Sequence, residues 1–191
     1  MFIKNFIKDS IETKQKILDD NSILTEIEKI SNVITNAYKS NKKVLLAGNG
    51  GSAADAQHIA AELVSKFSFD RKGLNAIALT INSSILTAIS NDYGYENIFS
   101  KQIEAYGQEG DVFIGISTSG ASKNIVNAVL EAKKNGLIIV GLTGNRRTEM
   151  DELCDYIIKV PSESTPNIQE SHIMVGHIIC ALVENSIYCK N

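Results

Sequence analysis

The chain has 191 residues, of which 43% are hydrophobic and 21% are charged, and its formal net charge is -3 at pH 7. This length and this balance are typical of one globular domain with a substantial core. The slightly acidic charge gives no reason to expect nucleic acid or an anionic membrane as a partner.

The sequence also argues against secretion and membrane insertion. No apolar run approaches the roughly 20 residues that a membrane-spanning helix needs, and residues 1–9 are apolar only in pieces, unlike a signal peptide. Cys154, Cys180 and Cys189 form no CxxC pair. They indicate reduced thiols in a cytoplasmic protein, and neither a disulfide framework nor a zinc site. We therefore expect a single cytoplasmic domain over residues 1–191.

Two amphipathic helices are predicted ahead of the first strand, over about residues 3–18 and 22–38. In the second, isoleucines recur at the spacing of one helix face, and Asp20-Asn21-Ser22 offers turn and capping chemistry between the two helices. A simple βαβ unit does not need these helices. We expect residues 1–40 to form an extension that packs on the sheet or on a neighbouring subunit.

Five short apolar runs then alternate with helical segments. Strands are predicted at residues 44–47, 75–79, 111–117, 137–142 and 156–160. Helices are predicted at residues 52–66, 83–90, 96–106, 122–135 and 167–188, with a break at residues 91–94. This alternation indicates a parallel sheet with helices on both faces. Ligands of such folds bind at the carboxyl ends of the strands, where the strand order reverses.

The first strand ends in a glycine-rich corner, Gly48-Asn49-Gly50-Gly51-Ser52. Glycines permit a sharp bend with positive φ, and the backbone amides at the start of the next helix favour an anion. The corner lacks the Gly-Lys-Ser/Thr ending of a P-loop. The second strand ends at Leu79-Thr80 without the carboxylate that a dinucleotide site uses, which argues against a nucleotide ligand.

The third strand ends in a cluster of hydroxyl groups, at Ser117, Thr118, Ser119 and Ser122, around Gly120. A helix cap would require only one of them. Four hydroxyls at a helix N-terminus suit a phosphate, whose oxygens accept hydrogen bonds from hydroxyls and amides without requiring a lysine. We therefore predict a phosphate site in this loop.

Two helices carry candidate ionisable groups. His58 and Glu62 lie four residues apart and share one helix face, which by itself could be a weak surface pair. On the last helix, Gln169 and His177 lie about 80° apart around the axis. His172 points about 140° away from His177, so we interpret it as structural or solvent-facing.

Together, the Gly48–Ser52 corner, the Ser117-Thr118-Ser119-Gly120-x-Ser122 loop and the Ile168-Gln169-Glu170-x-His172 segment resemble the phosphoheptose isomerases of the SIS (sugar isomerase) domain family. The resemblance covers nearly the whole chain. It implies a flavodoxin-like three-layer α/β/α sandwich with a five-stranded parallel sheet. It also implies a homotetramer with active sites at subunit interfaces.

The resemblance further assigns site residues. Glu62 and His177 correspond to the acid–base pair, and His58, Glu62, Gln169 and His177 to ligands of a zinc ion. The implied substrate contacts are Asn49, Gly50, Gly51, Glu62, Asn91, Asp92, Ser117, Thr118, Ser119, Ser122 and Gln169, with Ser52 as an additional hydroxyl. Asn167 stands where the family often has an arginine, so one anion contact lacks its usual residue.

The implied reaction is aldose–ketose isomerisation of sedoheptulose 7-phosphate to D-glycero-D-manno-heptose 7-phosphate through an enediol(ate). This is the first step toward ADP- or GDP-heptose for lipopolysaccharide or capsule. Two alternatives are a non-catalytic SIS protein that binds a replication initiator and a regulatory SIS domain that senses a phosphosugar. The presence of both Glu62 and His177 favours the isomerase. The sequence leaves open which of the two is the base.

Overall fold

The computed structural model describes residues 1–189 of the chain. Its strands are β1 (Val44–Gly48), β2 (Ala76–Ala78), β3 (Val112–Ser117), β4 (Ile138–Gly144) and β5 (Tyr156–Val160). They form one parallel sheet in the order β2-β1-β3-β4-β5. The chain leaves β1 toward β2 and then returns to β3 on the other side of β1. The switch point of the sheet therefore lies between β1 and β3.

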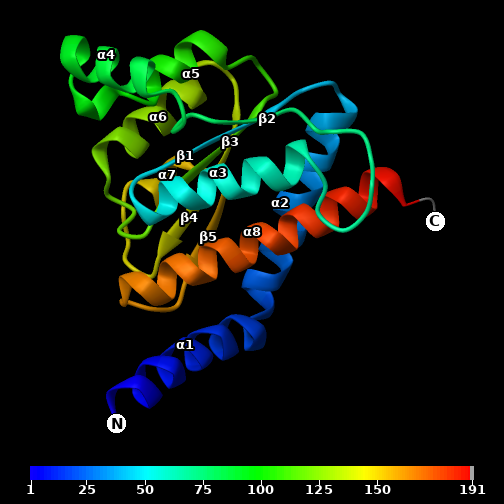
Figure 1. Ribbon diagram of the computed structural model, residues 1–191, viewed down its shortest axis with the longest axis vertical. Coiled ribbons are helices and arrows are strands. Elements are labelled where there is room, and N and C mark those ends of the chain that lie inside the picture. Colours follow the sequence, from blue (N-terminus) through cyan, green and yellow to red (C-terminus); the bar gives the residue numbers. More distant parts are fainter. Residues whose placement is uncertain (190–191) are drawn as a thin grey trace.

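Helices cover both faces of this sheet (Figure 1). One face is covered by α2 (Asn21–Lys39), α3 (Gly51–Val64) and α8 (Thr165–Tyr188). The other face is covered by α5 (Ser100–Tyr106), α6 (Lys123–Lys134) and the short α7 (Met150–Leu153). The remaining helical segments are α1 (Phe2–Asp19), α4 (Ser83–Tyr93) and the 3-10 turn η1 (Tyr95–Asn97). The predicted three-layer α/β/α sandwich with a five-stranded parallel sheet is confirmed.

The strand side chains divide between two apolar cores. Val44 and Leu46 of β1 pack in the core beneath α2, α3 and α8, whereas Leu45 and Ala47 pack in the core on the α5 and α6 side. All four are fully buried. Because both faces of the sheet are covered, the strand is apolar at every position and shows no alternation with polar residues.

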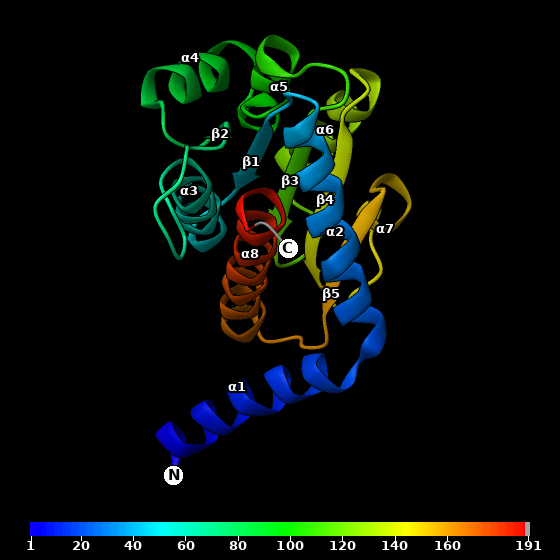
Figure 2. The same cartoon turned by 90° about the vertical axis from the view of Figure 1, so that its right-hand side faces the viewer.

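The two N-terminal helices differ in how firmly they pack. The isoleucines of α2 are buried against α8 and the sheet, and the Asp20 side chain accepts hydrogen bonds from the backbone amides of Ser22 and Ile23, as the sequence predicted. In contrast, α1 extends away from the sheet (Figure 2) and buries only Thr13 and Ile17. Most of its large apolar residues are exposed: Phe2, Ile3, Phe6, Ile7, Ile11 and Leu18. Within residues 1–189, no helix has both the length and the apolar character that crossing a membrane requires.

The main error in the predicted elements concerns residues 91–94. The break expected there is wrong, because α4 continues to Tyr93 and ends only at Gly94, whose φ is 87°. The predicted helix at residues 96–106 is instead divided into η1 and α5. None of the residues of α4 is buried, so packing does not reveal this helix in the sequence pattern.

Small residues let α3 and α8 approach closely on their face of the sheet. Ala56 and Ala60 are buried on α3, and Gly176 is buried on α8. A Cβ atom at Gly176 would lie only 2.5 Å from Cδ1 of Ile59. The absence of a side chain at position 176 therefore allows α3 and α8 to lie close together, which brings the polar residues of the two helices into one site.

Candidate active site

The two predicted ligand loops lie side by side at the switch point. The register pairs Gly48 of β1 with Ile116 of β3, so the glycine corner and the hydroxyl loop leave neighbouring strand ends. Gly50 has a φ of 55°, as the sharp bend requires. A Cβ atom at Gly48 would lie 2.4 Å from the backbone oxygen of Ser52, so the corner has no room for a side chain there.

A pair of asparagines joins the two loops. Asn49 Nδ2 donates to Asn124 Oδ1 at 2.9 Å, and Asn124 Nδ2 donates back to Asn49 Oδ1 at 2.9 Å. The Tyr95 hydroxyl also donates to Asn49 Oδ1, at 3.0 Å. Asn124 and Tyr95 were not predicted as site residues. No local pattern marks them, because each meets its partner only through the fold.

The hydroxyl loop has the clustering that the sequence predicted. Ser117 Oγ lies 3.1 Å from Ser122 Oγ and 3.4 Å from Ser119 Oγ. Ser122 is the N-cap residue of α6, yet its side chain makes no capping hydrogen bond. These hydroxyls are therefore turned toward one another at a helix N-terminus, where an anion is favoured.

A small cavity of about 110 Å³ adjoins this loop. Thr118 and Ser119 line it together with Arg146, which sequence reasoning missed. Arg146 follows the end of β4, and a basic residue at a neighbouring strand end could have been noticed in the sequence. Asn167, where the resemblance led us to expect an arginine, is buried.

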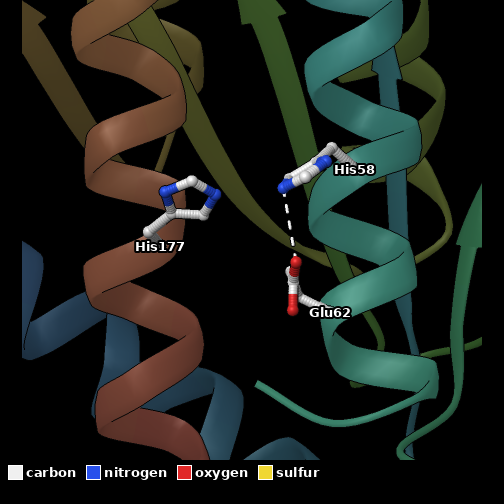
Figure 3. Close-up of side chains that lie close together, drawn as sticks. All are labelled: His58, Glu62 and His177. Carbon is white, nitrogen blue, oxygen red and sulfur yellow. Dashed lines mark ion pairs between the residues drawn. The ribbon is translucent and has the colours of Figure 1, made fainter. Parts of the chain in front are cut away.

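The predicted ionisable residues come together between α3 and α8 (Figure 3). His58 Nε2 lies 3.3 Å from Glu62 Oε1 on α3, and the His177 ring of α8 lies 5.1 Å from the His58 ring. One ligand atom from each of the three residues falls within 4.8 Å of the others. The Glu62 side chain is 23% exposed and the His58 side chain 53% exposed, so the cluster is open to a ligand.

Gln169 is connected to this site through Asp55, a residue that was not predicted from the sequence. Its Nε2 donates to Asp55 Oδ1 at 2.6 Å. Asp55 is 4% exposed, and its Oδ2 has no hydrogen-bond partner among the described residues. Burial raises the pKa of Asp55, while the hydrogen bond from Gln169 and the nearby His58 and His177 oppose that shift. Asp55 precedes His58 by three residues on the same helix face, a signal that could have identified it.

The cluster fits a zinc ion. Two imidazoles and one carboxylate are ligands that zinc commonly takes, and His58, Glu62 and His177 already converge. The fourth predicted ligand, Gln169, has its amide nitrogen bound to Asp55, which leaves its carbonyl oxygen as the donor atom. A zinc site composed of these residues remains a prediction.

Asn91 and Asp92 are not joined to either loop by any hydrogen bond of residues 1–189. They lie in the last turn of α4, where Asn91 Nδ2 donates to Asp92 Oδ1 at 2.8 Å, and both are exposed. Their predicted contact with substrate therefore stays a prediction.

His172 is a structural residue of α8. Its side chain is fully buried, and Nε2 lies 3.1 Å from the backbone oxygen of Thr143. Burial lowers the pKa of His172 to about 4. The interpretation of His172 as solvent-facing is therefore wrong, and its interpretation as structural agrees with this environment.

Comparisons with known proteins identify the family. A profile described as the SIS domain matches residues 5–144. A phosphoheptose isomerase of Aneurinibacillus thermoaerophilus is 59% identical over 187 residues, which cover 98% of this chain and 94% of that protein. The chain belongs to the phosphoheptose isomerase family.

Two solved structures of this family have the same fold. A phosphoheptose isomerase from Neisseria gonorrhoeae has a TM-score of 0.90 and 36% identity, with 96% of this chain and 97% of that chain covered. One from Francisella tularensis has a TM-score of 0.92 and 34% identity, with 96% of each chain covered. Membership confirms the isomerase of the SIS domain family predicted from the sequence and favours it over the binding and sensing alternatives.

Proposed function

We propose that the protein interconverts sedoheptulose 7-phosphate and D-glycero-D-manno-heptose 7-phosphate, with Glu62 and His177 as the acid–base pair. The observation that carries the proposal is the meeting of these two side chains between α3 and α8, more than a hundred residues apart in sequence. The product is an aldoheptose phosphate, which suits the supply of nucleotide-activated heptose for lipopolysaccharide or capsule.

The hydroxyl loop anchors the phosphate of the substrate. Ser117, Ser119 and Ser122 donate hydroxyl hydrogen bonds to its oxygens, and the amides at the start of α6 face the same anion. This binding takes place far from the reacting carbons. Its free energy is therefore available to position the sugar against Glu62 and His177.

The chemical step moves one proton between neighbouring carbons. A base takes a proton from C1 of the ketose while an acid gives one to the carbonyl oxygen at C2, which yields an enediol. A proton then returns to C2, and the hydroxyl on C1 loses its proton to become the aldehyde oxygen. No atoms are gained or lost overall. Glu62 and His177 supply both exchanging groups, since a carboxylate and an imidazole can each accept and return a proton.

We also propose that His58, Glu62, His177 and the amide oxygen of Gln169 hold a zinc ion. When bound, zinc polarises the substrate carbonyl as a Lewis acid. Asp55 fixes the amide nitrogen of Gln169 by its 2.6 Å hydrogen bond and so orients the amide oxygen in the opposite direction. Glu62 uses one carboxylate oxygen toward His58, which leaves the other for proton exchange.

The assembly is proposed as a cytoplasmic homotetramer with its active sites at subunit interfaces. The exposed apolar residues of α1 support this, because exposed apolar surface favours protein contacts. The His58 side chain is also exposed, so a neighbouring subunit could cover the site. The free thiols of Cys154, Cys180 and Cys189 support a reducing compartment. We regard residues 1–191 as one SIS domain with residues 1–40 as its helical extension.

The test is incubation of the purified protein with sedoheptulose 7-phosphate, with and without a chelator, followed by detection of an aldoheptose phosphate. We expect product that disappears on chelation and returns when zinc is added. No product at any metal content would contradict the isomerase and favour a protein that only binds its partner.

A further inference from the structure

A buried ion pair connects helix α8 with the segment that follows helix α3. Arg71 Nε donates to Glu184 Oε1 at 2.9 Å, and the two side chains are only 2% and 1% exposed. Arg71 belongs to the connection between α3 and β2, and Glu184 lies in the second half of α8. The pair therefore joins α8, which carries His177, to the segment that follows α3, the helix that carries Glu62.

Both members of the pair also bind backbone groups. The Glu184 carboxylate accepts the amides of Phe67 at 2.8 Å and Ser68 at 2.7 Å. The Arg71 guanidinium donates to the backbone oxygen of Glu62 at 2.8 Å and to that of Leu63 at 2.7 Å. Arg71 thus caps the C-terminal carbonyls of α3, which would otherwise lack partners inside the helix.

These bonds lead directly to the acid–base pair. Arg71 holds the main chain of Glu62 itself. Glu184 lies seven residues, or about two helical turns, after His177 on α8. Glu184 also fixes the backbone of Phe67, whose ring lies 5.7 Å from the His177 ring. The same ion pair therefore restrains the backbone on one side of the site and the packing of the imidazole on the other.

A second ion pair with a buried carboxylate, between Lys43 and Asp111, provides a comparison. Asp111 is 1% exposed and accepts hydrogen bonds from Lys43 Nζ, from the Lys43 amide and from the Gln108 amide. It thus resembles Glu184 in burial and bonding. Asp111 precedes β3, however, at the opposite end of that strand from the hydroxyl loop. Loss of Asp111 should affect the fold without disturbing the site.

We propose that Arg71 and Glu184 are positioning residues that set the placement of Glu62 and His177. Buried ion pairs contribute little net stability compared with well-packed apolar residues. Their directional bonds, in contrast, fix geometry, and a misplacement of about 1 Å can cost an enzyme about 100-fold in rate. The inference rests on the proposed function for its kinetic consequence, while its structural consequence is independent of the substrate.

The experiment compares Glu184→Gln and Arg71→Lys with the matched control Asp111→Asn. Zinc affinity is measured by competition with a chelating dye, and kcat and KM are measured with sedoheptulose 7-phosphate. We expect zinc affinity to fall about 10- to 100-fold in both site variants, the usual loss when a supporting contact of a metal ligand is removed. We expect kcat to fall and KM to change little, because the hydroxyl loop is untouched. Asp111→Asn should lower thermal stability but leave zinc affinity and kcat at wild-type values.

The imidazole proton resonances of His177 give a further readout that requires neither metal nor substrate. They should shift in Glu184→Gln, and also in Phe67→Leu, which removes the ring contact but retains the backbone bonds. A folded Glu184→Gln or Arg71→Lys variant with wild-type zinc affinity, kcat and His177 resonances would overturn the proposal. If Glu184→Gln fails to fold, unchanged resonances in Arg71→Lys and Phe67→Leu would overturn it equally. A wild-type protein without isomerase activity would refute the proposed function, while the resonances would still decide the positioning role.

Discussion

The buried imidazole of His172 makes the stability of the fold depend on pH in a predictable window. In the folded protein, burial lowers the pKa of His172 to about 4 from its ordinary value of 6.5. The unfolded chain therefore binds a proton at this residue at a higher pH than the folded protein does. The resulting stability is fully present above about pH 6.5 and is lost progressively as the pH falls toward 4.

The size of the effect follows from the two pKa values. One pKa unit corresponds to about 1.4 kcal/mol, so the complete loss is roughly 3 kcal/mol. Between pH 7 and pH 5, about 2 kcal/mol should already be lost. The structural reason is that the buried ring has only the Thr143 oxygen as a partner for Nε2, and its Nδ1 has no hydrogen-bond partner among the described residues.

Urea unfolding at pH 7 and pH 5 tests this, with protein concentration held fixed because the proposed assembly would also contribute to stability. The control is His172→Gln, which keeps a side-chain donor for the Thr143 oxygen but does not titrate. Between pH 7 and pH 5, the free energy of unfolding of the variant should fall by about 2 kcal/mol less than that of the wild type. This difference does not depend on how much the substitution destabilises the protein at pH 7. Every other ionisable group is present in both proteins, so its contribution to the difference cancels. An equal decrease in the free energy of unfolding of the two proteins would show that His172 is not the source of the pH dependence.

Three further predictions concern the site. Glu62→Gln and His177→Gln should each lower kcat by at least about 100-fold, because each removes a proton-exchanging group. The circular dichroism spectrum should be unchanged in both variants. Near-normal turnover in either would contradict the assignment of Glu62 and His177 as the acid–base pair. Ser119→Ala should raise KM and the dissociation constant of the sugar phosphate about tenfold, because one hydrogen bond to a charged group is lost. The value of kcat should be less affected. Unchanged binding would count against the phosphate site. Gly176→Ala should lower the free energy of unfolding in urea by about 1–3 kcal/mol and should also lower kcat. The reason is that the added Cβ would lie 2.5 Å from Ile59 Cδ1 and push α3 away from α8. Wild-type stability and turnover in this variant would argue against this close packing.

Much of the fold could be predicted because its signals are local. The apolar runs of β1 and β3 are buried on both faces, and that burial is visible in sequence as uninterrupted hydrophobicity. The Asp20 cap could also be predicted from the sequence, since a capping side chain binds amides within three residues of itself. The end of α4 could not be predicted from the sequence. Asn91 and Asp92 continue the helix, which ends at Gly94, and α4 has no buried face whose pattern would indicate its length.

For the site, the residue types alone were enough to predict candidate chemistry, namely groups suited to proton exchange, metal binding and phosphate binding. His58 and Glu62 share a helix turn, and the hydroxyls around Gly120 share a loop, so their proximity follows from backbone geometry. Which residues they meet across the fold follows from the packing of the helices. His177 reaches Glu62 because Gly176 lets α8 approach α3, and Arg71 meets Glu184 across 113 residues of chain. Such contacts depend on how helices pack on the sheet, and the residue types at either end do not specify them.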